Sequence, residues 1–107
     1  MRMWNVDPSL LCRQHLLGEH VEMHMFAGAI RLRTSVLGYL ERGLVETGKI
    51  GQRHDELVAE MEKRGMNHRS PLAQPPTHDF GEVDSEANLT ELARRCPACA
   101  TLQGERR

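Results

Sequence analysis

The sequence has few aromatic residues and no long apolar run. Phe, Trp and Tyr together make up 4% of its 107 residues, so a hydrophobic core must rest on Leu, Val, Ile and six Met. No stretch approaches the ~20 consecutive apolar residues that cross a membrane. The N-terminus also lacks the charged, apolar and small-residue segments of a secretory signal. We therefore expect a cytoplasmic protein without a membrane partner.

The sequence also has no large excess of charge of either sign, and its number of cysteines is odd. The 14 basic and 15 acidic residues give a formal net charge of −1. This balance excludes nucleic-acid binding through bulk charge and leaves only a local basic patch. Three cysteines, an odd number, argue against the disulfide framework of a small secreted protein. A chain of this length has room for one hydrophobic core and hence for one compact domain.

What the sequence does contain is a dense polar stretch, Gln14 to Ile30, with three histidines and two glutamates among apolar residues. Residues three, four or seven positions apart share one face of a helix. A helix with this composition either lines a site or simply exposes a solvated polar face. The spacing predicts three stripes: His15, Glu19, Glu22 and Phe26; His20 and His24; and Leu10, Leu17 and Val21, which we expect in the core.

Capping signals divide the N-terminal two thirds of the chain into helices. Asp7-Pro8 is typical of a helix start and predicts one long helix from there to residue 30. Further signals predict a short helix or turn over residues 34–47, and a helix over residues 48–64 that is capped by Thr47 and followed by Gly65.

The chain changes character after Gly65. Residues 66–79 hold three of the five prolines and predict an extended loop. Asp84 can cap a further helix that must stop near Cys96-Pro97, and we expect the last eight residues to fray. The sequence therefore predicts an all-α fold: a compact helical core over residues 1–70, then a proline-rich loop, a short helix and a CxxC tail over residues 71–107.

Two groups of residues have metal-ligand spacing. Cys96-Pro-Ala-Cys99 is half of a zinc site, a redox pair or two free thiols. Zinc would need further ligands from Cys12, from a histidine such as His68 or His78, or from another chain. His20 and His24, one helical turn apart, could also grip a metal, although Val21 replaces the glutamate of zinc proteases. The competing interpretation is that both are partly exposed histidines beside a packing seam.

The first 70 residues or so carry a resemblance to a known family. The matching motifs are Gln14-His15-Leu16, Glu19, Glu22, the neighbourhood of Phe26 and Gly28, and Lys63-Arg64-Gly65. In these motifs the chain resembles the viral-type pyrimidine-dimer DNA glycosylases, small all-helical enzymes that also nick abasic DNA. Two features of that family are missing: Val21 stands where the family has an arginine, and no basic, aromatic C-terminal segment is recognisable.

The resemblance implies roles for residues that composition alone would not single out. Aligned without gaps, the family's nucleophilic α-amine falls on Met1, its catalytic glutamate on Glu22 and a DNA-contacting arginine on Arg2. We expect Met1 to keep its free amine, because Arg2 is too large for the usual removal of the initiator. His15, two turns before Glu22, could orient that carboxylate or contact a phosphate.

The chemistry implied is base excision followed by strand cleavage. An α-amino group has an ordinary pKa of about 7.7–8, so a useful fraction is neutral at pH 7 and can attack a sugar carbon. No cofactor is required, although zinc could be bound. The expected partner is damaged double-stranded DNA, contacted by Arg2, Arg31 and Arg33. The alternative is a non-catalytic helical module that binds DNA or protein, stapled by zinc through the CxxC.

Overall fold

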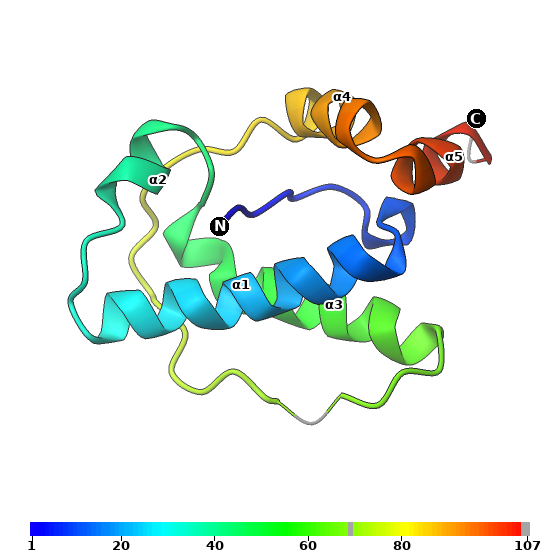
Figure 1. Ribbon diagram of the computed structural model, residues 1–107. Coiled ribbons are helices and arrows are strands. Elements are labelled where there is room, and N and C mark those ends of the chain that lie inside the picture. The colour runs from blue at the N-terminus through cyan, green and yellow to red at the C-terminus, as the bar shows by residue number, and fades with distance from the viewer. Residues whose placement is uncertain (69, 106–107) are drawn as a thin grey trace.

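The structure is a computed structural model that describes residues 1–68 and 70–105, and every regular element in that part of the chain is a helix (Figure 1). The all-α prediction is confirmed. The described elements are 3-10 helices, labelled η, and α-helices. In chain order they are η1 Pro8–Leu10, α1 Arg13–Arg31, α2 Leu37–Glu41, η2 Thr47–Lys49, α3 Ile50–Lys63, α4 Ser85–Arg95 and α5 Pro97–Glu105.

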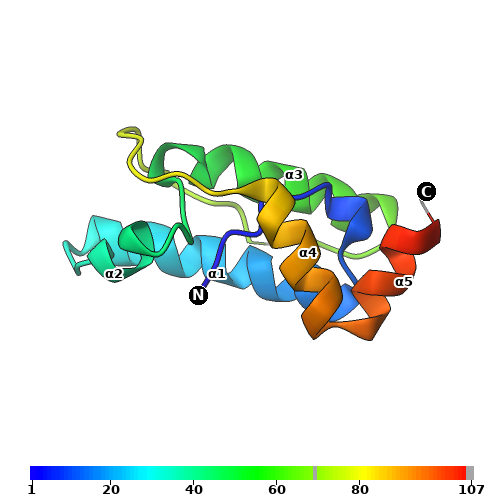
Figure 2. The same ribbon diagram turned by 90° about the horizontal axis from the view of Figure 1, so that it is seen from above.

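Helices α1 and α3 form the main packing interface and run antiparallel (Figures 1 and 2). Their facing sides supply fully buried side chains, among them Leu16, Met23 and Phe26 from α1 and Ile50 and Leu57 from α3. The α3 helix ends as predicted: Gly65 takes φ +79°, and the N–H groups of residues 65 and 66 return to carbonyls of the last turn.

The N-terminal segment is extended and buried, which positions the first residue. It lies along the α1–α3 pair below α4, and the N-terminus comes to rest beside the middle of α1 (Figures 1 and 2). Met3 is fully buried and its N–H donates to the Leu44 carbonyl (2.7 Å). The Asn88 amide of α4 donates to the Trp4 carbonyl (2.8 Å).

The C-terminal region is an integral part of the core. Asp84 caps α4 through the Ala87 N–H, as the sequence predicts, and α4 stops at Arg95. Leu92 and Cys99 are fully buried, and α5 packs against η1. The prediction of a frayed end was wrong for residues 100–105, which continue α5; residues 106–107 lie outside the described part.

Helix α1 differs from the prediction at its start and in its buried face. Asp7 caps only the 3-10 turn η1, and the chain then breaks before α1, whose N-cap is Cys12. The expected apolar stripe was also wrong, because Val21 is 54% exposed. The buried face follows Leu16, Met23 and Ala27 instead, and it includes polar residues that have partners on α3.

Thr47 does not cap α3, contrary to the prediction; it anchors the loop that follows α3. Its hydroxyl donates to the His78 carbonyl (2.7 Å) and accepts from the Phe80 N–H (2.8 Å). The described residues of the predicted loop, 66–79, contain no helix, as expected. The two hydrogen bonds to Thr47 fold the end of this loop back onto the segment between α2 and α3. Within residues 1–68 and 70–105, no helix is both long and apolar enough to span a membrane.

Candidate active site and metal centre

The N-terminal amine lies next to the Glu22 carboxylate. Met1 N is 3.7 Å from Glu22 Oε1, and the Glu22 side chain is 29% exposed. The amine reaches this place because the segment behind it is held on both sides, by the Leu44 carbonyl and by the Asn88 amide. The two groups that the resemblance singled out, 21 positions apart, are therefore in direct electrostatic contact.

Both groups line a polar cavity of about 500 Å³. Burial raises the pKa of the Glu22 carboxyl above its usual value, although the Met1 amine and the Arg2 backbone N–H act in the opposite direction. A carboxylate with incomplete hydration interacts strongly with any positive charge that develops beside it. The cavity is lined by Met1, Arg2, Trp4, Gln14, His15, Gly18, Glu19, Glu22, Tyr39, Arg42, Leu44 and Arg95.

Three arginines from separate elements converge on this cavity. Arg2 belongs to the N-terminal segment, Arg42 follows α2 and Arg95 ends α4. The Arg2 guanidinium lies 4.2 Å from the centre of the Trp4 ring and donates to the Asn88 side chain. Burial, together with the neighbouring Arg95 and Arg42 guanidinium groups, lowers the pKa of Arg2. The positive groups therefore repel one another. Glu91, whose carboxylate is 2.6 Å from Arg95 Nε, offsets part of this repulsion, and a bound anion would offset more of it.

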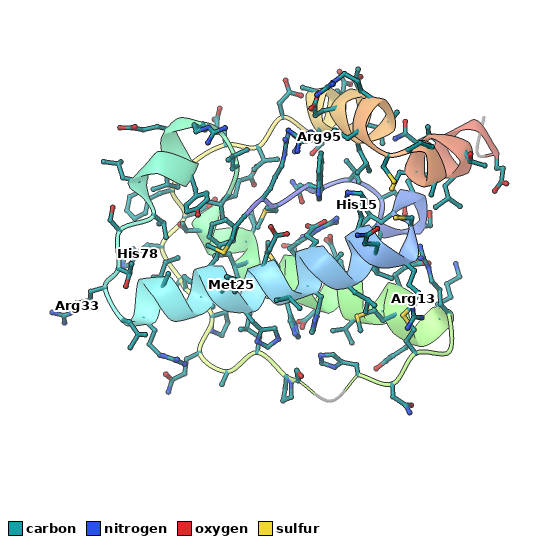
Figure 3. All side chains as sticks on the ribbon, in the orientation of Figure 1. Arg13, His15, Met25, Arg33, His78 and Arg95 are labelled. Carbon is teal, nitrogen blue, oxygen red and sulfur yellow. The ribbon has the colours of Figure 1, made fainter. Side chains whose placement is uncertain are left out.

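Arg31 and Arg33 do not belong to this cavity. They line a second, largely apolar cavity of about 520 Å³ at the other end of α1, together with Pro75 and Phe80. In Figure 3, Arg33 points outward at that end, whereas His15 and Arg95 lie toward the opposite end. Arg42 and Arg95 were missed in the sequence, because only the fold brings the ends of α2 and α4 to the N-terminus.

Cys96 and Cys99 meet Cys12 and His15, at the start of α1. The four candidate ligand atoms all lie within 4.8 Å of one another. The Cys12 and Cys96 sulfurs are 3.8 Å apart, and His15 Nδ1 is 3.3 Å from Cys12 Sγ and 3.6 Å from Cys99 Sγ. A tetrahedral zinc ion with ordinary bond lengths needs about 3.8 Å between two sulfurs and about 3.6 Å between sulfur and nitrogen.

The surroundings of these sulfurs suit thiolates. The Cys12 N–H donates to Cys99 Sγ (3.2 Å) and the Cys99 N–H to Cys96 Sγ (3.4 Å). Without a cation, burial raises the pKa of Cys99 to about 12, while hydrogen bonds outweigh burial and lower that of Cys96. A Cys3His set is a common structural zinc site, and this cluster could hold zinc.

The predicted zinc half-site therefore gains partners from α1. Cys12 was one of the candidates named from the sequence, whereas His68 and His78 lie elsewhere. His15 was expected beside Glu22, but its ring Nδ1 contacts the sulfurs of Cys12 and Cys99. Two helical turns, about 10 Å, separate His15 from Glu22 along α1.

Glu19 has a structural partner that the sequence did not reveal. Both residues of the Glu19–Arg53 ion pair are almost completely buried, with Arg53 Nη2 2.9 Å from Glu19 Oε1. Arg53 Nη1 also donates to the Val6 carbonyl (2.7 Å). The pair thus ties α1 and α3 to the N-terminal segment that carries the amine.

Comparison with known families decides where this chain belongs. The sequence profile of the family described as pyrimidine dimer DNA glycosylase matches residues 1–74. The chain belongs to that family. No curated protein and no solved structure matches it. The family match includes the Met1–Glu22 pair but ends before α4 and α5, so Arg95 and the two C-terminal cysteines lie outside it.

Proposed function

We propose that this chain is a DNA glycosylase with abasic-site lyase activity, acting on damaged DNA such as pyrimidine dimers. The observation that carries the proposal is the 3.7 Å contact between the Met1 amine and Glu22 in a cavity that three arginines surround. Membership of the glycosylase family agrees with it. The substrate nucleotide must be flipped out of the duplex to reach such a cavity.

The reaction would use the amine as nucleophile. Its lone pair attacks C1′ of the sugar, the C–N bond forms, and the damaged base leaves with its bonding electrons. Ring opening then gives an imine to Met1. Loss of the C2′ proton expels the 3′ phosphate, and water finally releases the amine. Glu22 would stabilise the positive charge on the sugar and then carry the C2′ proton.

Phosphates would bind to arginines at two distances from the reacting sugar. Arg2, Arg42 and Arg95 would hold phosphates next to the flipped nucleotide, because all three line the cavity. Arg31 and Arg33 would contact the duplex further along, since nine residues of helix place Arg31 about 13 Å from Glu22 along the axis of α1.

The Cys12–His15–Cys96–Cys99 cluster would be a zinc staple and not part of the chemistry. It joins the start of α1 to the junction of α4 and α5, and so fixes Arg95 over the cavity. His15 would serve as a zinc ligand here, in place of the first expectation that it orients Glu22 or contacts a phosphate. A zinc-stapled binding module without catalysis is the second candidate.

Imine trapping tests the proposed reaction. Protein with a free N-terminus is incubated with abasic-site DNA and borohydride, and the adduct is mapped by peptide. We expect it on Met1, and expect an N-terminal extension to abolish it. Glu22→Gln should cut strand nicking by ~10²–10⁴-fold, the usual worth of a positioned acid–base.

Two controls make the result decisive. Glu62→Gln removes an exposed carboxylate of α3 and should leave nicking unchanged. Lys49 and Lys63 are the two lysines of the chain, so an adduct on either would contradict the terminal-amine mechanism. No adduct at all from folded protein with a free N-terminus would favour the binding module.

A further inference from the structure

Four of the six histidines meet on the side of α1 away from Glu22. His20 and His24 belong to α1, His54 to α3 and His68 to the loop that follows α3. Their candidate ligand atoms all lie within 4.8 Å of one another, and the His20 ring centre is 4.9 Å from each of the other three. Residues two positions from Glu22 point about 160° away from it around the helix.

Two ring nitrogens in this cluster have no hydrogen-bond partner. The Nε2 atoms of His20 and His24 are buried, and no described residue is within bonding geometry of either. His20 is 7% exposed and His54 only 3%. Burying a polar nitrogen without a partner costs free energy, so such atoms usually mark a group that completes the site.

His54 cannot satisfy both of its neighbours as a neutral ring. Its Nδ1 lies 3.1 Å from an Asp55 carboxylate oxygen, and its Nε2 lies 3.2 Å from the Ser70 carbonyl oxygen. Both neighbours are acceptors, whereas a neutral imidazole has one N–H and one lone pair. If the N–H goes to Asp55, the Nε2 lone pair faces an oxygen, and either a second proton or a metal cation at that point would resolve the conflict.

The surroundings of His20 and His24 favour the neutral imidazole, which is the form that binds metals. Burial and the neighbouring His54, His24 and His68 lower the pKa of His20 to about 4. Burial and the neighbouring His54 and His68 lower the pKa of His24, although the Ser70 backbone acts in the opposite direction. The candidate ligand atoms of the four rings converge on one point, and no carboxylate or thiolate belongs to the set.

We propose that His20, His24, His54 and His68 bind one divalent transition-metal ion of the zinc type. Imidazole nitrogens suit zinc, nickel and copper, in contrast to calcium or magnesium. Tetrahedral zinc needs about 3.3 Å between two ligand nitrogens. The nitrogens here lie within 4.8 Å of one another, so the most distant pair must approach by roughly an ångström when the metal binds. The Asp55 carboxylate would accept the Nδ1–H of His54 and so orient the ring whose Nε2 binds the metal.

This metal would tie α1, α3 and the following loop together, and it is independent of the glycosylase proposal. Its ligands come from three segments, of which only α1 carries a residue of the candidate active site. The competing explanation is four imidazoles packed around the Ser70 carbonyl, which accepts from His68 Nε2 at 2.8 Å. That arrangement leaves the two Nε2 atoms of His20 and His24 unpaired.

Zinc stoichiometry separates the two explanations. Full-length protein without a histidine tag is equilibrated with zinc, and bound metal is counted after free metal is removed. With the Cys3His site also filled, we expect two zinc ions per chain. His24→Gln/His68→Gln, at two part-exposed positions, should bind one fewer. His78→Gln alters an exposed histidine outside the cluster and should bind as many as the unaltered chain.

A second measurement needs no variant and so does not depend on variant folding. X-ray absorption at the zinc edge should find more nitrogen than sulfur ligands in the unaltered protein, because four imidazoles join the Cys3His set. Asp55→Asn should weaken zinc binding at the histidine cluster about 10-fold, the lower end for carboxylates that orient a metal-bound histidine. A sulfur-rich shell, with the zinc count unchanged in His24→Gln/His68→Gln, would overturn the proposal.

Discussion

The ion pair of Glu19 and Arg53 shows how one buried contact supports the candidate site. Removing two charges from water costs several kcal/mol, and the cost is offset only where the geometry is good and all polar atoms are bonded. Arg53 meets that condition through Glu19, the Val6 carbonyl and Glu56. The pair holds the N-terminal segment, and hence the amine, so it positions the nucleophile without touching substrate.

Truncation of Arg53 should therefore be severe. Arg53→Leu leaves Glu19 charged, buried and unpaired, and we expect a loss of about 3–5 kcal/mol in the free energy of unfolding, measured by denaturant titration. The matched double variant Glu19→Leu/Arg53→Leu should recover most of that loss, because no charge is left stranded. A double variant as unstable as the single one would mean that packing, and not charge, sets the cost.

The sequence could predict residues whose role is local or inherited, but not those defined by a distant partner. Met1 and Glu22 came from the family motifs, and their 3.7 Å contact agrees with that origin. The role of Glu19 depends on Arg53, 34 positions away, for which no spacing rule exists. His15 is similar, because its sulfur neighbour Cys99 belongs to another part of the chain.

At the scale of elements, the caps Asp84 and Gly65 were predictable, whereas the helix starts expected from Asp7 and Thr47 and the buried face of α1 were not. Asp84 and Gly65 act through hydrogen bonds to neighbouring residues, so local sequence suffices to predict them. The buried face of α1 depends on what packs against it. Because α3 offers Arg53 and His54, Glu19 and His20 are buried while the apolar Val21 is exposed. Neither interpretation of the polar stretch, a face that lines a site or a solvated face, includes burial against polar partners on α3.

The ends of α2 and α4 should matter for DNA affinity. With a net charge near zero, we expect weak, salt-sensitive binding to undamaged duplex, within ~10⁻⁴–10⁻⁶ M. Each lost phosphate contact lowers the slope of log affinity against log salt by about 1. Arg42→Ala/Arg95→Ala should therefore lower it by about 2, as read by fluorescence anisotropy at several salt concentrations.

The comparison pair is Arg31→Ala/Arg33→Ala, which removes equal charge from the other end of α1. We expect it also to weaken binding to a long duplex, but to leave binding to a short duplex centred on the lesion unchanged, because these arginines lie away from the cavity. If both pairs flatten the slope equally on the short duplex, DNA must cover the whole length of α1. An unchanged slope for Arg42→Ala/Arg95→Ala would mean that neither arginine contacts phosphate.

At the scale of the whole molecule, the folded core includes residues that lie beyond the end of the family match. The match ends at residue 74, yet Leu92 and Cys99 beyond it are fully buried against the N-terminal part. The Asn88 amide reaches the Trp4 carbonyl, 84 positions away. The C-terminal helices are short, so their packed area alone is small, and a metal staple is the usual means by which such a segment stays attached.

Loss of the zinc staple should therefore detach the tail and spare the core. In Cys96→Ser/Cys99→Ser we expect limited proteolysis to cut after Asp79, while α1 and α3 stay protected because their interface does not include the cluster. Strand nicking and borohydride trapping at Met1 should both fall, since Arg95 is no longer held over the cavity and Asn88 no longer holds the N-terminal segment. A tail as resistant to protease as in the unaltered chain would show that packing of Leu92 and Asn88 holds it without metal.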